Sequence, residues 1–460
     1  MIVMKFGGSS VADAARLRHV ADIINTQADR KPVLVLSAMG DTTDHLLEAG
    51  DAALKQGKVE ITQIENLHQA TVKNLKLVRE QLTNEPLADG IKPSQKDFNG
   101  LLDELKRLLS GIALIRELTP RTKDYLVSFG ERLSVRLAAA FFRSVNMNAR
   151  AFDAFDTGFI SNSDYTKAEL LKESWDLIPQ KILPLIKENI IPVITGFIAK
   201  DAKGCITTLG RGGSDLSATM IAASCKAEEI QVWKDVDGIL TADPRIVKNA
   251  RPVQNVTYDE AAELAYFGAQ VLHPRAMLPC MKTGTPVLVK NSYNTDAPGT
   301  RIENAAVSAK KSPPVRAITS RRNVTLVDIV STRMLGQYGF LAEVFSVFAR
   351  NSISVDMVAT SEVSVSLTLD AAFDLGEVKK ELSKIAQVEV KGGKAIVSII
   401  GNVKRSSEIL ARAFRICQFI GVPVQMISQG ASKVNISFIV NDTEADEVVK
   451  ALHMDFFDAQ

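Results

Sequence analysis

Apolar residues follow two alternating spacings over the first 300 positions of the chain. Ile2–Phe6 is a short apolar run, and residues 14–26 follow it with large apolar side chains at helical intervals. Residues 32–37 form a Val- and Leu-rich run, which is typical of a parallel strand buried on both faces. The alternation predicts an α/β domain with a largely parallel sheet flanked by helices. Four more strands are predicted, at residues 191–195, 205–209, 229–234 and 286–290.

Residues 45–119 depart from this alternation, because they are charged and rich in helix formers. Apolar residues recur there at helical spacing, as at Ile61, Ile64 and Leu67. This stretch is predicted to be a helical insertion in the sheet domain, and a further helix is predicted to begin at Phe129.

A linker is predicted at residues 306–316, where Lys-Lys-Ser-Pro-Pro interrupts the pattern. Prolines lack a backbone donor and lysines favour solvent, so a strand is disfavoured there. The linker divides the chain into a first domain, residues 1–305, and a C-terminal region.

The C-terminal region contains an internal repeat. Phe414 follows Phe345, and Met426 follows Met357, at the same distance of 69 residues. Each copy has the order strand, helix, strand, strand, helix, which predicts two small βαββαβ modules. The modules are assigned to residues 317–391 and 392–460, with helices at 341–350 and 407–419 and strands at 355–360, 363–369, 424–428 and 435–440.

The composition is that of an ordinary globular protein, with 46% hydrophobic and 23% charged residues. The net charge of +2 gives no indication of a nucleic acid or a membrane surface as partner. No apolar run reaches the roughly 18–20 residues of a membrane span, and the N-terminus lacks the layout of a signal peptide. Four scattered cysteines without a C-x-x-C pair indicate a reducing compartment, so a cytoplasmic protein is expected.

The first chemical motif, Lys5-Phe6-Gly7-Gly8-Ser9-Ser10, joins a strand to a helix through two glycines. Glycine lets backbone N–H groups approach an anion, the helix N-terminus adds positive potential, and lysine brings a mobile charge for a phosphoryl group. The motif is not a P-loop, since no G-x-x-x-x-G-K-[ST] occurs in the chain. A plain strand-turn-helix would explain the same residues, so this motif alone leaves both interpretations open.

A second glycine loop, Thr208-Leu209-Gly210-Arg211-Gly212-Gly213-Ser214-Asp215, again follows a strand and opens a helix. Ser214 is predicted as the N-cap, and Asp215 falls in the first turn, where the helix dipole favours an anion. Arg211 can hold a carboxylate through two parallel hydrogen bonds. Helix capping would explain Asp215 but not an arginine between glycines, so a binding role is favoured.

Two further segments carry candidate polar residues. Lys234-Asp235-Val236-Asp237-Gly238 ends a strand, where open α/β sheets bind ligands, although Asp237-Gly238 alone would also make a turn. Glu131, in Ser128-Phe129-Gly130-Glu131, could capture an ammonium group or simply favour a helix start. His273 precedes a proline and has no cysteine or histidine partner, so neither a catalytic base nor a metal ligand is predicted there.

Five segments occur in the order seen in aspartate kinases, and the chain resembles this branch of the amino-acid kinase family over essentially its whole length. The segments are KFGGSSVA, SFGERLS, GRGGSDLSAT, WKDVDGILTADPR and AAELAYFGAQVLHPRAM. The repeat resembles tandem ACT modules, and the helical insertion resembles the monofunctional, lysine-sensitive type. The resemblance implies transfer of the γ-phosphoryl group of ATP, with Mg²⁺, to the β-carboxylate of L-aspartate. The product would be 4-phospho-L-aspartate, in the first step of lysine, threonine and methionine biosynthesis.

The same resemblance implies roles for individual residues. Those implied to act on the phosphoryl group are Lys5, Gly7, Gly8 and Asp215. Those implied to bind aspartate or to order its site are Ser9, Thr43, Glu131, Arg211 and Ser214, with Arg211 on the α-carboxylate and Glu131 on the α-ammonium group. Those at positions where relatives hold the nucleotide are Lys234, Asp235, Leu240, Arg245 and Gln270.

Two of the nucleotide positions depart from the pattern of relatives. Gln270 stands where many relatives have a lysine, and Leu240 stands where several have an aromatic residue, so Leu240 is expected only to pack. No general base is required, because the side chain of aspartate is already ionised near pH 7. Catalysis is expected to rest on positioning and on charge neutralisation by Lys5, backbone N–H groups and Mg²⁺.

The first module resembles the effector-binding part of lysine-inhibited aspartate kinases. The residues that carry this resemblance are Met334, Gly339, Phe340, Leu341, Ser354, Val355, Asp356, Ser361, Glu362 and Val363. Asp356 or Glu362 could pair with the distal ammonium group of lysine, or both could be solvated strand ends. A shift of 69 residues turns them into Gln425 and Ala431, so only the first module is expected to bind the effector.

Several alternatives stay open at this point. Threonine, or lysine with S-adenosylmethionine, could be the effector. Another amino-acid kinase, acting on glutamate, acetylglutamate or carbamate, would share the glycine loop, but the Ser-Phe-Gly-Glu segment and the ACT pair favour aspartate. A non-catalytic amino-acid sensor is disfavoured by Lys5, Arg211 and Asp215. Tandem modules of this family usually pair across a two-fold axis, so a homodimer is expected.

Overall fold

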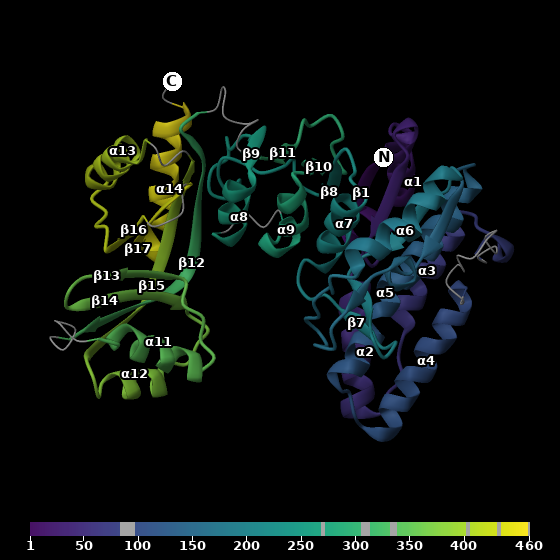
Figure 1. Ribbon diagram of the computed structural model, residues 1–460, viewed down its shortest axis with the longest axis horizontal. Helices are drawn as coiled ribbons and strands as arrows, with labels where there is room; N and C mark the ends of the chain where they lie inside the picture. Colours follow the sequence, from purple (N-terminus) through teal and green to yellow (C-terminus); the bar gives the residue numbers. More distant parts are fainter. Residues whose placement is uncertain are drawn as a thin grey trace. The chain divides into compact units, whose positions relative to one another are not determined.

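The computed structural model describes residues 1–82, 97–267, 272–304, 313–331, 338–401, 405–429 and 434–458 (Figure 1). By its internal contacts the chain divides into two compact units. The first unit comprises Met1–Ile239, Gln254–Tyr258 and Val271–Ser308, and the second comprises Leu240–Val253, Asp259–Gln270 and Ala309–Gln460. Most of the predicted linker lies outside the described residues. In the part of the chain that the structure describes, no helix is long and apolar enough to cross a membrane.

An eight-stranded sheet forms the centre of the first unit. Its strands are β1 (Ile2–Phe6), β2 (Pro32–Leu36), β3 (Ala149–Phe152), β5 (Ile191–Thr195), β8 (Ile230–Lys234), β9 (Asn255–Thr257), β10 (Val287–Asn291) and β11 (Thr300–Glu303). They lie in the order β3-β5-β2-β1-β8-β10-β11-β9, and each neighbouring pair is parallel except β10–β11. Both β1 and β2 are buried along their whole length, as the apolar pattern of a covered parallel sheet requires. The predicted α/β fold is confirmed.

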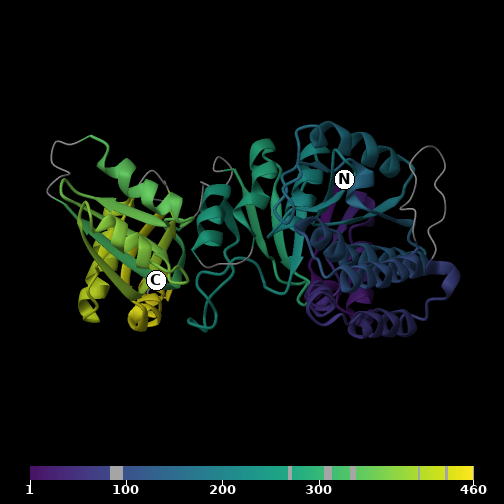
Figure 2. The same ribbon diagram turned by 90° about the horizontal axis from the view of Figure 1, so that it is seen from below.

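Helices flank this sheet, and three of them pack side by side. The helices are α1 (Ala14–Asn25), α2 (Thr42–Gln56), α3 (Thr62–Asn74), α4 (Phe98–Ile115), α5 (Pro120–Ser144), α6 (Ser174–Lys187), α7 (Gly213–Ser224) and α9 (Pro274–Thr283). Figure 2 shows the purple and blue helices of this unit running together, and α2, α4 and α5 contact one another. A small sheet is formed by β4 (Ile160–Ser161), β6 (Ile198–Asp201) and β7 (Ile206–Thr208), and the turns η1 (Gly8–Val11) and η4 (Ala154–Thr157) adjoin the strands β1 and β3.

Helix α5 begins earlier than the sequence predicted. Thr119 is its N-cap and accepts a hydrogen bond from the N–H of Thr122, and Pro120 occupies the first helical position. Threonine followed by proline is a strong start signal, and a helix start at Phe129 was therefore wrong. Because the helix starts at Pro120, Glu131 lies in the middle of α5 and has no role in starting it.

The second unit contains a six-stranded antiparallel sheet. Its strands are β12 (Val315–Val330), β13 (Met357–Thr360), β14 (Ser364–Asp370), β15 (Gln387–Gly401), β16 (Met426–Ser428) and β17 (Asn435–Asn441), in the order β13-β14-β12-β15-β17-β16. The helices are α11 (Phe340–Arg350), α12 (Gly376–Leu382), α13 (Ser406–Phe419) and α14 (Ala445–His453), and most of α8 (Tyr258–Tyr266) also belongs to this unit. The helices and strands predicted for both repeats are present.

Two long strands, β12 and β15, run through both repeats of the second unit. The later half of β12 pairs with β14 and with the start of β15, whereas its earlier half, from Val315 to Arg321, pairs with the end of β15. The register shifts between Arg321 and Leu326, where the strand passes from one repeat to the other. Separate apolar cores lie under the two repeats, one around Phe348 and Leu367 and the other around Phe438 and Leu452.

Candidate active site

The carboxyl ends of three neighbouring strands bring the predicted phosphate-binding residues together. Strands β2, β1 and β8 are adjacent and parallel, so their ends meet at one edge of the sheet. Lys5 lies near the end of β1, Ser37 directly follows β2, and Lys234 is the last residue of β8. Ligands of open α/β sheets bind at this edge.

Asp215, in the first turn of α7, holds the two lysines. Its Oδ1 lies 2.7 Å from Lys5 Nζ and its Oδ2 lies 3.5 Å from Lys234 Nζ. Burial alone would raise the pKa of Asp215, but the charges of Lys5 and Lys234 outweigh it, so the pKa is lowered and the group is a carboxylate. Burial lowers the pKa of Lys234, and the Asp215 carboxylate partly offsets this. Two cations on one anion leave a surplus positive charge at the sheet edge.

The glycine turn after β1 is fixed by residues far away in the sequence. The hydroxyl groups of Ser10 and Ser292 are 2.8 Å apart, and the Tyr293 hydroxyl donates to the carbonyl of Ser9 over 3.0 Å. A Cβ on Gly8 would lie 2.9 Å from the carbonyl oxygen of Ala38, so only glycine lets these two loops approach each other. The N–H of Gly7 is already bonded to the carbonyl of Trp233 and does not face a ligand.

A cavity of about 450 Å³ opens beside the lysines. It is lined by Lys5, Ser37, Thr43, Glu131, Phe197, Gly210, Arg211, Gly212, Gly213, Ser214 and Asp215. The structure thus brings together six predicted residues: Lys5, Thr43, Glu131, Arg211, Ser214 and Asp215. Ser37 and Phe197 were not predicted as site residues, and Phe197 has a left-handed backbone, with φ of 68°.

Glu131 projects a buried carboxyl group to this cavity. The backbone N–H of Ala38 donates to its Oε1 over 3.3 Å, whereas its Oε2 is buried and has no hydrogen-bond partner. Burial raises the pKa of Glu131 to about 8. Gly130 permits the close approach of the loop after β2, because a Cβ there would lie 2.8 Å from the Cβ of Ala38. A buried carboxyl with a vacant oxygen is suited to a cation from the ligand.

The second glycine loop is shaped by a left-handed residue. Gly212 has φ of 74° and is the N-cap of α7, so the prediction of Ser214 as the cap was wrong. Sequence preference pointed to Ser214 because serine is a good cap, but only glycine fits the backbone at position 212. A Cβ on Gly212 would lie 2.6 Å from the Cβ of His273, which itself caps α9 by accepting from the Arg275 N–H. Arg211, between the glycines, is exposed.

The structure describes three of the four other residues predicted to bind the nucleotide. Asp235 follows Lys234 and is exposed. Leu240 and Arg245 belong to the second unit, where Arg245 is exposed and pairs with Asp243 over 2.6 Å. Gln270 lies outside the described residues. Among the residues that are described, no group of three or more His, Cys, Asp or Glu side chains could hold a metal ion.

The predicted effector residues lie around the start of α11 and the β13–β14 hairpin of the second unit. Asp356 has an almost completely buried side chain, and the Tyr266 hydroxyl donates to its Oδ1 over 2.7 Å. Its Oδ2 lies 3.1 Å from Nη1 of Arg321, so an internal cation already occupies this carboxylate. Glu362 is exposed in the β13–β14 turn with Ser361 and Val363. Gly339, Phe340 and Leu341 begin α11, Ser354 and Val355 precede Asp356, and Met334 and Ala431 lie outside the described residues.

Comparison with known proteins agrees with this geometry. A model of the amino acid kinase family matches residues 1–291, and an ACT domain model matches residues 327–383 and 397–456. The chain therefore belongs to the amino-acid kinase family.

Similar proteins show to which branch of the amino-acid kinase family the chain belongs. Aspartokinase 1, chloroplastic, of Arabidopsis thaliana is 51% identical over 468 residues, which cover 99% of this chain and 80% of that protein. Lysine-sensitive aspartokinase 3 of Escherichia coli is 35% identical over 474 residues, with 100% and 99% coverage. The crystal structure of E. coli aspartokinase III with aspartate and ADP superposes with a TM-score of 0.79 at 35% identity, over 99% of this chain and all of that one. The structure of the same enzyme with lysine and aspartate gives 0.79 at 34% identity, with 99% of each chain covered.

Within the family the chain is an aspartokinase, an aspartate kinase of the phosphotransferase class. The interpretation drawn from the five sequence motifs is confirmed, and so are the tandem ACT domains. Other amino-acid kinases and a non-catalytic sensor are set aside.

Proposed function

We propose that the 450 Å³ cavity is the aspartate site and that the Lys5–Asp215–Lys234 cluster handles the transferred phosphoryl group. One observation carries this assignment. The same cavity contains surplus positive charge and a buried carboxyl group, that of Glu131, whose Oε2 has no hydrogen-bond partner. Aspartate carries both groups that such a cavity needs, an α-ammonium group and two carboxylates.

The substrate is held by opposite charges at its two ends. Glu131 accepts the α-ammonium group, which restores the ionised form of a carboxyl that burial otherwise keeps protonated. Arg211 grips the α-carboxylate with its planar guanidinium group. Thr43 and Ser214 line the cavity and offer hydroxyl groups to the substrate, and Ser9 is assigned to it on the sequence resemblance alone. The β-carboxylate is left to face Lys5.

Phosphoryl transfer then needs no proton movement. A β-carboxylate oxygen forms a bond to the γ-phosphorus of ATP, and the bond from that phosphorus to the bridging oxygen of ADP breaks, with the electron pair leaving on ADP. Lys5 neutralises the charge that gathers on the transferring group, and Asp215 positions Lys5 and Lys234. Mg²⁺ enters with ATP as part of the substrate.

The nucleotide is assigned to residues at and beyond the end of β8. Lys234 and Asp235 lie next to the glycine turn of Gly7 and Gly8, because β8 neighbours β1 in the sheet. Leu240, Arg245 and Gln270 complete this assignment on the strength of the sequence resemblance alone.

We assign the regulatory effector site to the first ACT module, with lysine as the effector. The E. coli relative is called lysine-sensitive, and one of its crystal structures contains lysine. Asp356 supplies a nearly buried carboxylate for the distal ammonium group. A homodimer through the ACT modules is supported by the exposed apolar side chains of Tyr338, Leu341 and Phe345 at and before α11.

The cytoplasm is the proposed compartment, because all four cysteines are free in the structure. The three Arabidopsis relatives are chloroplastic proteins. Fractionation of the source cells tests this assignment.

Release of ADP from MgATP, measured with and without aspartate and with and without lysine, tests the proposed activity and effector. Release that requires aspartate and falls with lysine supports both assignments. ADP release that is unchanged by lysine alone but falls with threonine, or only with lysine and S-adenosylmethionine together, would contradict lysine as the effector. It would not contradict aspartate as the substrate. Release with glutamate but not with aspartate would contradict the roles of Glu131 and Arg211.

A further inference from the structure

A second cavity, of about 740 Å³, lies in the first unit and shares no lining residue with the aspartate site. Its walls come from α4, α5, η4 and the β6–β7 hairpin. The two cavities share helix α5, because Glu131 lines one of them and Arg132, the next residue, lines the other. Successive helical residues point about 100° apart, so a single helix can serve both.

Arg132 is the central feature of this second cavity. Only 7% of the residue is exposed, and its Nε donates to Asp153 over 3.3 Å. Asp153 is already held by Arg136, whose two terminal nitrogens reach its two oxygens at 3.0 and 3.1 Å. Nη1 of Arg132 is buried and has no hydrogen-bond partner. A buried cationic donor without a partner is costly, which indicates that an acceptor from a ligand completes it.

Two further cations line the cavity. Arg121 is exposed in the first turn of α5, and Lys200 lies on β6 with its ammonium group 3.6 Å from the centre of the Phe155 ring. In the described part of the chain, neither Arg121 nor Lys200 lies within ion-pair distance of a carboxylate. The Tyr125 hydroxyl donates to Oε1 of Glu104 over 2.6 Å, and Asp156 is a third carboxylate of the wall besides Glu104 and Asp153. The cationic groups that an anion in this cavity could reach are therefore Arg121, Lys200 and the buried Nη1 of Arg132.

We propose that this cavity binds a small organic anion that carries a phosphate or carboxylate group and an aromatic or other apolar portion. Arg132 Nη1, Arg121 and Lys200 would bind the anionic group, and the rings of Tyr125 and Phe155 offer apolar surface beside them. The volume lies within the usual range for small-molecule sites, about 300–1,000 Å³. The site is independent of the roles assigned to Lys5, Glu131 and Arg211.

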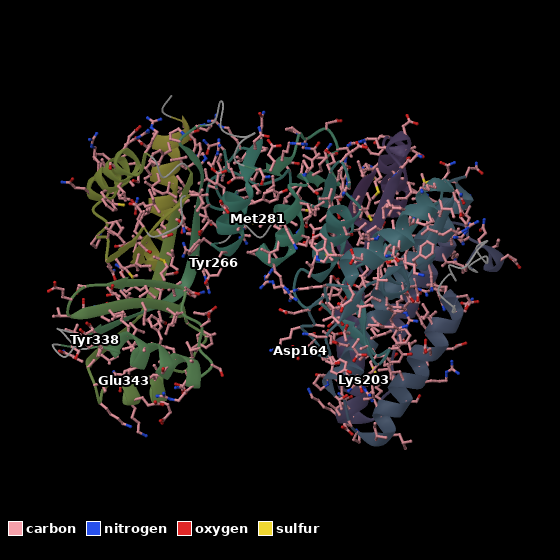
Figure 3. All side chains as sticks on the ribbon, viewed as in Figure 1. Asp164, Lys203, Tyr266, Met281, Tyr338 and Glu343 are labelled. Carbon is pink, nitrogen blue, oxygen red and sulfur yellow. The ribbon has the colours of Figure 1, made fainter. Side chains whose placement is uncertain are left out.

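Phenyl phosphate is a suitable probe, because it joins a phosphate to one aromatic ring. It is titrated by calorimetry into the full-length chain saturated with ADP and aspartate, so that the active site is occupied. We expect saturable binding that weakens by about fivefold or more in Arg121→Ala and in Lys200→Ala. Lys203→Ala is the matched control, because Lys203 is exposed in the turn between β6 and β7 and does not line the cavity (Figure 3). Its affinity should equal that of the unchanged chain.

Arg132→Met should abolish binding, and circular dichroism shows whether this variant is folded. If Arg132→Met is not folded, Arg121→Ala and Lys200→Ala still decide the test. Benzoate, titrated in the same way, identifies the preferred anion: tighter phenyl phosphate indicates a phosphate ligand, and tighter benzoate indicates a carboxylate ligand. The proposal is overturned if the loaded protein shows no saturable binding of either probe. Equal affinities in Arg121→Ala, Lys200→Ala and Lys203→Ala, or binding only in the absence of ADP and aspartate, would also overturn it.

Discussion

Binding of aspartate should depend steeply on pH, because Glu131 must change its charge. Burial raises the pKa of Glu131 to about 8, so the empty site holds a protonated carboxyl at pH 7. With that pKa, only about one molecule in ten has the ionised group at pH 7, and about one in a hundred at pH 6. The α-ammonium group binds the ionised form, and each bound substrate therefore expels a proton. The KM for aspartate should fall by about tenfold from pH 6 to pH 7 and by about a further fivefold from pH 7 to pH 8, and it should level off above pH 8.

Two assays measure this effect. Initial rates of ADP release at saturating MgATP give the KM for aspartate from pH 6 to pH 8. Calorimetry in two buffers of different ionisation enthalpy gives the number of protons released, which should be about 0.9 at pH 7. Glu131→Gln removes the titrating group, so its KM should vary little with pH. At pH 8 its KM should exceed that of the unchanged chain by about tenfold or more, because a hydrogen bond to a charged group is lost.

The control is Glu48→Gln, since Glu48 is exposed on α2 and its loss should leave the pH profile unchanged. A KM that is flat from pH 6 to pH 8 in the unchanged chain would refute the role of Glu131. A slope that persists in Glu131→Gln would refute it as well, because another group would then carry the titration. Burial and the neighbouring charges of Arg211 and Arg275 lower the pKa of His273, so a titration centred near pH 8 would not be that of His273.

Five further substitutions separate the remaining roles. Lys5→Ala should lower kcat by about 10²–10³-fold with a much smaller change in the KM for aspartate, and steady-state kinetics with the opposite split would contradict its role in transfer. Arg211→Ala should raise the KM for aspartate by about tenfold or more with a smaller loss of kcat, measured in the same assay. Arg321→Ala should lower the lysine concentration for half-inhibition by about threefold to tenfold, because Arg321 competes with lysine for Asp356; an unchanged value would exclude this competition. Asp356→Ala should abolish inhibition by lysine while Gln425→Ala retains it, and the reverse result would place the effector in the second module.

Several residues that the sequence singled out line one cavity of the structure, whereas the residues around them were harder to predict. Lys5, Arg211 and Asp215 stand in glycine loops next to strands, and the order of the strands in a parallel sheet then brings their ends together. Ser37 and Phe197 could not be assigned in the same way. Their roles depend on a strand end and on a left-handed backbone, and neither has a distinctive local pattern.

Partners that are distant along the chain were the least predictable part. Ser292 and Tyr293 hold the glycine turn of Ser9 and Ser10 from more than 280 residues away, through contacts that no spacing rule anticipates. The same holds for Arg321 on Asp356, because the carboxylate was predicted to face an effector and its internal partner lies on another strand. Two residues were also candidates for the N-cap of α7. The residue type favoured Ser214, but the left-handed backbone of Gly212 makes Gly212 the cap.

The shared strands β12 and β15 have a consequence for the way the nascent chain folds. Leu326 pairs with Thr368 in the first repeat, but the partner of Ile318 within the sheet is Ile399, which is synthesised 81 residues later (399 less 318). At a synthesis rate of about 5–20 residues per second, the apolar stretch around Ile318 has to wait roughly 4–16 s for its partner. During that interval it is an open strand edge, and such an edge promotes aggregation. A chain truncated between the two repeats would keep that strand edge unpaired permanently. Because both repeats share β12 and β15, the C-terminal region is expected to unfold in a single transition and not as two separable modules.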